Sequence, residues 1–176
     1  MAKEQETTSG ALKTAIQMEI DGKAFYLKTS QTSKNELGKS LLKKLADEED
    51  IHRKVFENIY RDISAKQGWP ETKVSFDGGQ GLRTIFSRAM EAMAKDTKSI
   101  PTEIDAVEKA MEMENKTYDF YKKRVGLAAF AGEKEFYEKI AAQEKEHHRV
   151  LLDYFEFLKN PASWFAVKEH PAVDGG

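Results

Sequence analysis

Hydrophobic residues recur at spacings of three, four and seven along four long stretches of the chain, which is the period of an amphipathic α-helix. The stretches predict helices over about residues 9–30, 35–65, 102–126 and 132–159. The last stretch stops at Asn160-Pro161, and such a pair strongly disfavours continuation of a helix. With helices predicted over all four stretches, the pattern predicts an all-α protein.

A different kind of sequence lies between the second and third stretches, over residues 66–101. Trp69-Pro70 and Gly78-Gly79 are typical of irregular loops, and residues 82–95 predict one short amphipathic helix. The segment is too long for a tight turn between neighbouring helices. It therefore suits a crossover that joins two helical hairpins.

The chain also contains an internal repeat, because a shift of 95 residues aligns its two halves without a gap in either helix. In the first helix of each half, the recurring residues are Ala11, Ala15, Met18, Glu19, Phe25, Tyr26 and Lys28, which return as Ala106, Ala110, Met113, Glu114, Phe120, Tyr121 and Lys123. In the second helix they are Lys44, Ala46, Glu49, His52 and Val55, which return as Lys139, Ala141, Glu144, His147 and Val150. One offset serves both helices, so the sequence predicts two duplicated hairpins, about 9–65 and 102–159, in one four-helix domain spanning 1–176.

Six of the repeated residues are polar although they lie on the apolar stripes. They are Glu19, Glu49, His52, Glu114, Glu144 and His147. Four converging carboxylates repel one another unless they are protonated, reach water at the end of the bundle, or bind cations. The Glu and His of each Glu-x-x-His motif project from one face of a helix, so both can bind one ion. Four carboxylates and two neutral imidazoles suit two divalent ions, with Fe or Mn favoured and Zn possible.

Composition excludes several other classes of protein. The chain has no Cys, which removes disulfides, thiol catalysis, iron–sulfur clusters and Cys-ligated zinc. A formal net charge of −2 without a basic block argues against nucleic-acid binding. No apolar run reaches the roughly 20 residues that span a bilayer. The polar opening MAKEQETTSG does not resemble a signal peptide, so we expect a cytoplasmic protein with no membrane partner.

Four motifs over residues 10–160 resemble the rubrerythrin branch of the ferritin-like superfamily. They are Met18-Glu19 with Tyr26, Glu49-Asp50-Ile51-His52, Met113-Glu114 with Tyr121, and Glu144-Lys145-Glu146-His147. The resemblance implies a ferritin-like antiparallel four-helix bundle around two iron ions. It also implies that Glu49 and Glu144 bridge the metals, that Glu19 and Glu114 bind at the ends, and that His52 and His147 each bind one metal.

The function implied by this resemblance is that of a non-haem di-iron oxidoreductase that reduces hydrogen peroxide. Its electrons would come from a separate donor protein, since the Cys-rich rubredoxin domain of typical rubrerythrins has no counterpart here, and a homodimer is expected. The second Glu that typical rubrerythrins carry one turn after the third-helix ligand is replaced by Thr117. This leaves a symmetric set of six ligands and puts in doubt the redox-linked movement of one iron between a Glu and a His.

The same six residues also suit two other functions. A ferroxidase would oxidise ferrous iron with oxygen and pass it to a store, whereas a non-enzymatic bundle would bind metal mainly for stability. A metal-free structural bundle would leave the carboxylates on the stripes unexplained.

Several neighbouring side chains have a functional and a structural interpretation. Tyr26 and Tyr121 are expected to hydrogen-bond the candidate ligands, the alternative being tyrosines buried for packing alone. Helical phase predicts that His148 faces outward, and His170 in the tail 160–176 is interpreted as structural or solvated. Trp164 and Phe165 are expected to cover one end of the bundle. The remaining charged neighbours of the ligands are predicted to be solvated: Glu48, Glu112 and Glu146.

Overall fold

The structure, a computed structural model, describes residues 2–65, 68–71, 76–77, 79–92, 101–161 and 163, except for the side chains of 2–6, 89–92 and 101–102. These residues form α-helices and connecting segments, with no β-strand among them. The helices are α1 (Ala2–Thr32), α2 (Glu36–Ser64), α3 (Gln80–Ala92), α4 (Pro101–Leu127) and α5 (Ala131–Lys159). The predicted all-α architecture is confirmed.

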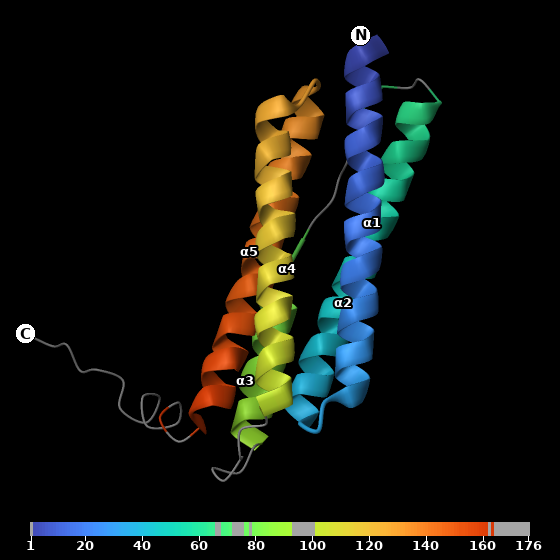
Figure 1. The fold of residues 1–176 in the computed structure, drawn as a ribbon. Helices are drawn as coiled ribbons and strands as arrows, with labels where there is room; N and C mark the ends of the chain where they lie inside the picture. The colour runs from blue at the N-terminus through green and yellow to red at the C-terminus, as the bar shows by residue number, and fades with distance from the viewer. Residues whose placement is uncertain are drawn as a thin grey trace, which may run out of the picture.

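The four long helices form two antiparallel hairpins, α1 with α2 and α4 with α5 (Figure 1). Helices α2 and α4 run in the same direction, so the chain has to travel back along the bundle between them. The crossover makes this return, and its helix α3 packs against α2 and α5 at one end of the bundle. The length of the crossover segment is therefore explained by the parallel course of α2 and α4.

The bounds of the helices follow the sequence repeat closely. The first and last residues of α5 are those of α2 displaced by 95 positions, and the last residues of α1 and α4 also differ by 95 positions. Asn35 caps α2, because its side-chain oxygen accepts a hydrogen bond from the backbone N–H of Leu37 at 2.9 Å. The duplicated hairpin predicted from the sequence is thus visible in the helices themselves.

The beginning of α1 differs from the prediction, because the helix starts at Ala2 rather than near residue 9. Thr8 is buried, and its hydroxyl lies 3.4 Å from both carboxylate oxygens of Glu133 in α5. This tertiary contact holds a polar turn that has no hydrophobic periodicity of its own. Helix α3 also begins two residues early, at Gln80.

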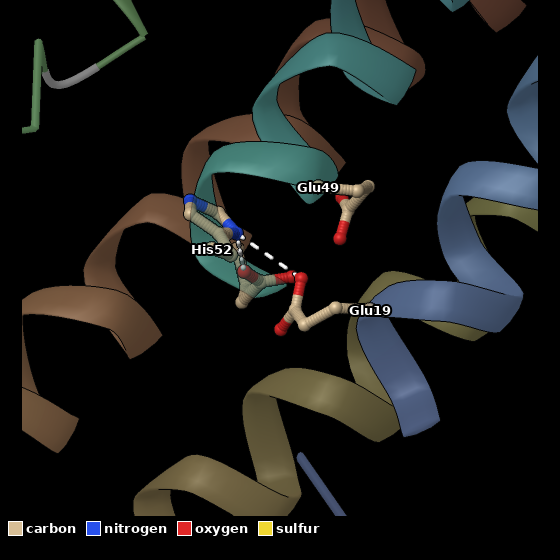
Figure 2. Close-up of side chains that lie close together, drawn as sticks. Glu19, Glu49 and His52 are labelled. Atoms are coloured by element: carbon tan, nitrogen blue, oxygen red, sulfur yellow. Dashed lines mark hydrogen bonds and ion pairs between the residues drawn. The ribbon is translucent and has the colours of Figure 1, made fainter. Parts of the chain in front are cut away.

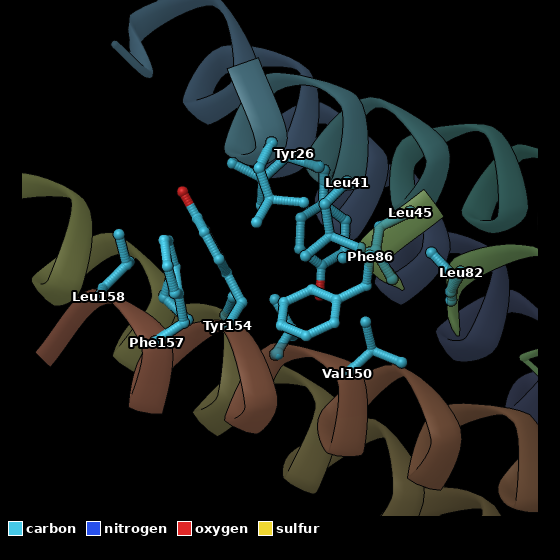
Figure 3. Packing of buried hydrophobic residues seen from close by; sticks show 14 of the residues in the cluster. Tyr26, Leu41, Leu45, Leu82, Phe86, Val150, Tyr154, Phe157 and Leu158 are labelled. Atoms are coloured by element: carbon cyan, nitrogen blue, oxygen red, sulfur yellow. The ribbon is translucent and has the colours of Figure 1, made fainter. Parts of the chain in front are cut away.

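The interior of the bundle consists of two apolar clusters, one towards each end. The first contains Leu41 and Leu45 of α2 and Val150 of α5, with Phe86 of α3 lying between Leu45 and Val150 (Figure 3). The second is built around Phe56, whose ring lies edge-on to Phe136 with 5.2 Å between ring centroids. Along every long helix, the six polar residues of the repeat fall between the residues of one cluster and those of the other.

Some expectations fall outside the described residues, namely the packing of Trp164 and Phe165 and the surroundings of His170. Among the helices that the structure describes, none is both long and apolar enough to cross a membrane.

Candidate metal centre

The six polar residues of the repeat meet in the middle of the bundle. One comes from α1, one from α4, and a Glu-x-x-His pair from each of α2 and α5. Figure 2 shows Glu19, Glu49 and His52 turned toward a common space between their helices. All six side chains are buried, with exposed fractions of 3% or less: Glu19, Glu49, His52, Glu114, Glu144 and His147.

These side chains form two groups that could each hold a metal ion. One group is Glu19, Glu49, His52 and Glu144, and the other is Glu49, Glu114, Glu144 and His147. Within a group, the candidate ligand atoms lie within 4.8 Å of one another. Glu49 and Glu144 belong to both groups, which is the placement required of carboxylates that bridge two ions.

The ring nitrogens of the two histidines face these carboxylates. Nδ1 of His52 lies 3.3 Å from Oε2 of Glu19 and 3.2 Å from Oε1 of Glu144. Nδ1 of His147 lies 3.3 Å from Oε1 of Glu49 and 3.5 Å from Oε2 of Glu114. The two rings are nearly parallel, with 5.5 Å between their centroids, and each histidine belongs to a different group.

Several ligand atoms of the second group lack a hydrogen-bond partner among the described residues although they are buried. They are Oε1 of Glu49, Oε2 of Glu114, Oε1 of Glu144 and Nδ1 of His147. Buried polar atoms that make no hydrogen bond are costly, and here they converge on one place. A divalent cation would satisfy them together. The oxygen-rich donor set with one imidazole per group fits iron or manganese well.

The protonation of the carboxylates follows the same two-fold pattern. Burial, reinforced by the neighbouring carboxylates, raises the pKa of Glu49 and of Glu144 well above the usual value. Burial also opposes ionisation of Glu19 and Glu114, but the histidines and hydrogen bonds nearby outweigh it and lower the pKa of each. Without metal, these shifts favour the protonated form of the two shared carboxyls, and a bound ion would take the place of those protons.

The two predicted tyrosines contact the candidate ligands, and they do so across the hairpins. Tyr26 of α1 donates a hydrogen bond to Glu114 of α4, and Tyr121 of α4 donates one to Glu19 of α1. Both rings are buried, and burial together with the nearby carboxylates raises the pKa of each phenol well above 10.0. The hydroxyls therefore stay protonated and orient the carboxylates at the two ends of the centre.

Removing one of these hydroxyls should lower the metal affinity of the group that contains its hydrogen-bond partner. Tyr26→Phe should lower metal affinity about tenfold at the group of His147, since Glu114 loses its hydrogen-bond donor. Anaerobic calorimetric titration with Co²⁺ measures this. Tyr154→Phe is the matched control, because Tyr154 donates to Glu103 away from the centre. The role of Tyr26 is contradicted if both variants leave the metal affinities equal to those of the unmodified protein.

The prediction that Glu48 is solvated is wrong. Glu48 is 5% exposed, and its Oε2 lies 2.9 Å from Nε2 of His147. Burial opposes its ionisation, but the hydrogen bond and charge of His147, together with Lys44, lower the pKa of Glu48 to about 2. The sequence did carry a signal, since Glu48 stands four residues before His52 and so shares its helix face.

The other neighbours of the ligands lie outside the two groups. Glu112 is exposed, as predicted, whereas Glu146 is only partly exposed and pairs with Arg83 of α3. His148 is half-buried and belongs to neither group. Thr117 donates a hydrogen bond to the carbonyl of Met113 at 3.1 Å, so its hydroxyl is engaged by its own helix.

Comparison with known protein families matches residues 10–155 to the family described as Rubrerythrin. The chain belongs to the rubrerythrin family. Its bundle is accordingly ferritin-like, and its buried cluster of Glu and His is compatible with a metal site. No curated protein and no solved structure matched the chain.

Proposed function

We propose that the chain binds two iron ions and reduces hydrogen peroxide with electrons from a separate donor protein. The observation that carries this proposal is the sharing of Glu49 and Glu144 by two four-residue groups. Residues shared in this way would hold two ions close enough together to act on one small molecule. The six ligands would be those predicted from the sequence, with one histidine for each ion.

When bound as ferrous ions, the pair would supply two electrons to break the O–O bond of peroxide. The balanced reaction takes up two protons and releases two molecules of water, and the donor protein then restores the electrons. The residues of the chain hold the site in place for this reaction. Tyr26 and Tyr121 orient the terminal carboxylates, and the apolar clusters on either side keep bulk water away.

A cavity of about 160 Å³ lies beside one histidine of the centre. Its lining extends from Ile51, which is 50% exposed, to His52, which is 1% exposed. Peroxide is only slightly larger than a water molecule, whose share of the liquid is about 30 Å³. The cavity therefore supports access of a small oxidant from the α2–α5 face.

The test is anaerobic loading with Fe²⁺ followed by stoichiometric addition of peroxide. We expect two irons per chain, one peroxide consumed per pair of ferrous ions, and far slower oxidation by oxygen, measured by iron absorbance and residual peroxide. Oxidation that is faster with oxygen than with peroxide indicates a ferroxidase instead. Two bound metals that respond to neither oxidant indicate a non-enzymatic metal protein, and a chain that binds no metal contradicts the whole proposal.

A further inference from the structure

Glu48 contacts the candidate centre from outside the set of six ligands. Its Oε2 accepts hydrogen bonds from Nε2 of His147 at 2.9 Å and from Nε2 of Gln143 at 3.0 Å. Its Oε1 lies 3.2 Å from Nζ of Lys44, one turn earlier in α2. The carboxylate is thus fixed on three sides, with its charge directed at the outer nitrogen of His147.

The arrangement around Glu48 occurs in only one of the two repeats. The residue 95 positions after Glu48 is Gln143, an uncharged amide that donates to Glu48 itself. Only one of the two Glu-x-x-His motifs therefore has a carboxylate four residues before its histidine. The two groups match in their ligands but differ in what lies behind the imidazole.

The surroundings of His52 differ accordingly. The ring of His52 is perpendicular to that of Phe76, with 5.3 Å between centroids, and His52 lines the cavity of about 160 Å³. Glu48 and Gln143 line the same cavity, yet Glu48 is bonded to His147. Hence His147 lies behind a fixed carboxylate, whereas His52 lies next to open space.

A carboxylate that accepts the outer N–H of a ligating imidazole fixes the ring in orientation and tautomer and makes the other nitrogen a better donor. Nδ1 is the nitrogen of His147 that faces Glu49 and Glu114, so the bond to Nε2 leaves the correct atom for a metal. Loss of such a partner commonly lowers metal affinity about 10-fold to 100-fold.

We propose that Glu48 is a positioning residue that makes the two metal positions unequal, with tight binding at His147 and weaker, exchangeable binding at His52 beside the cavity. This inference rests on the proposed metal centre. It adds to that proposal a difference between the two halves of the site, which the symmetric set of ligands does not contain.

The first experiment is anaerobic calorimetric titration of the full chain with Co²⁺. The unmodified protein should bind two ions in two resolved steps. Glu48→Gln should weaken the tighter step about 10-fold to 100-fold and leave the weaker step within about threefold. Asp47→Asn is the matched control, since it removes one negative charge from the exposed neighbouring position and should change neither step.

A second variant separates positioning from simple stabilisation of α2. Lys44→Met removes the ion pair with Glu48 but leaves the bonds of Glu48 to His147 and Gln143. If Glu48 acts through His147, Lys44→Met should keep both affinities within about threefold of the unmodified protein. If Glu48 serves only the ion pair, Lys44→Met should weaken the tighter step as much as Glu48→Gln does, which contradicts the inference.

The third readout reports on the imidazole directly. In the Zn²⁺-loaded protein, ¹⁵N NMR should show the Nε2 proton of His147 protected from exchange with water, and Glu48→Gln should reduce this protection, because a neutral amide oxygen is a weaker acceptor than a carboxylate. Equal affinities of the two steps in the unmodified protein, or an unchanged tighter step in Glu48→Gln, overturn the inference while the metal centre stands. An unmodified protein that binds no Co²⁺ overturns both.

Discussion

Glu144→Ala is expected to abolish binding of both metal ions, with a loss of affinity of more than about 100-fold. Glu144 belongs to both groups of candidate ligands, so its removal takes one oxygen donor from each ion at once. The loss should exceed the effect of any residue that acts through a ligand, for which about 10-fold to 100-fold is typical. Glu49→Ala should behave alike, since Glu49 is the equivalent residue of the other hairpin. Metal content after anaerobic loading and calorimetric titration measure both.

Two controls distinguish loss of the centre from loss of the fold. Glu138→Ala removes an exposed carboxylate from the same helix and should retain both ions. His148→Ala should also retain them, whereas His147→Ala should not, because only His147 belongs to a group. Helical content by circular dichroism should remain close to that of the unmodified protein in each variant. A Glu144→Ala protein that keeps two ions per chain contradicts the bridging role.

The metal-free protein is expected to lose stability as the pH rises, and the metal-loaded protein is expected not to. Burial and neighbouring carboxylates raise the pKa of Glu49 and Glu144 well above 4.5. Burial opposes protonation of His52 and His147, but the carboxylates around them raise both pKa values above 6.5. The folded state therefore binds more protons than the unfolded state, and its free energy of unfolding falls with rising pH.

The pH range in which each group contributes to stability follows from the direction of its pKa shift. The histidine contribution is fully present below pH 6.5 and is lost as the pH rises through the raised pKa values. Glu19 and Glu114, whose pKa values are lowered, act only toward acid, where their contribution is lost below pH 4.5. Thermal unfolding at several pH values from about 6 to 9 should therefore show a falling midpoint in the presence of a chelator.

Metal should reverse this trend, because each ion takes the place of the protons in the folded state. At a free metal concentration about 1,000 times the dissociation constant, one ion adds about 4 kcal/mol to the free energy of unfolding. The double variant Glu49→Ala/Glu144→Ala serves as the control and should lose the metal effect. The same slope of midpoint against pH with and without metal contradicts the assignment of the protons to this centre.

Most of the fold could be predicted from the sequence, because helical periodicity is a local property. The pattern predicted the four long helices, the crossover with its short helix and the repeat of 95 residues. The early start of α1 was not, because it depends on a contact between Thr8 and Glu133, which are far apart in the chain. A polar turn carries no periodic signal to reveal such a contact.

The sequence predicted which residues form the candidate site better than it predicted which of them contact one another. A Glu and a His three residues apart share one face of any helix, so each Glu-x-x-His pair can be recognised from a single segment of the sequence. The sequence led us to expect Glu48 in water, since it is adjacent to a ligand and charged. Its burial depends on His147 and Gln143, which belong to the other hairpin.

The sequence by itself determined the helices, the duplication and the six polar side chains on apolar stripes, because each follows from spacing along one segment. Only the tertiary structure decided that Tyr26 and Glu48 form hydrogen bonds with residues of the other hairpin. Tyr26 bonds Glu114 rather than Glu19 of its own helix, and Glu48 supports His147 rather than its neighbour His52. These pairings depend on the register at which the two hairpins pack, which is set by the apolar clusters across all four helices and by no single segment.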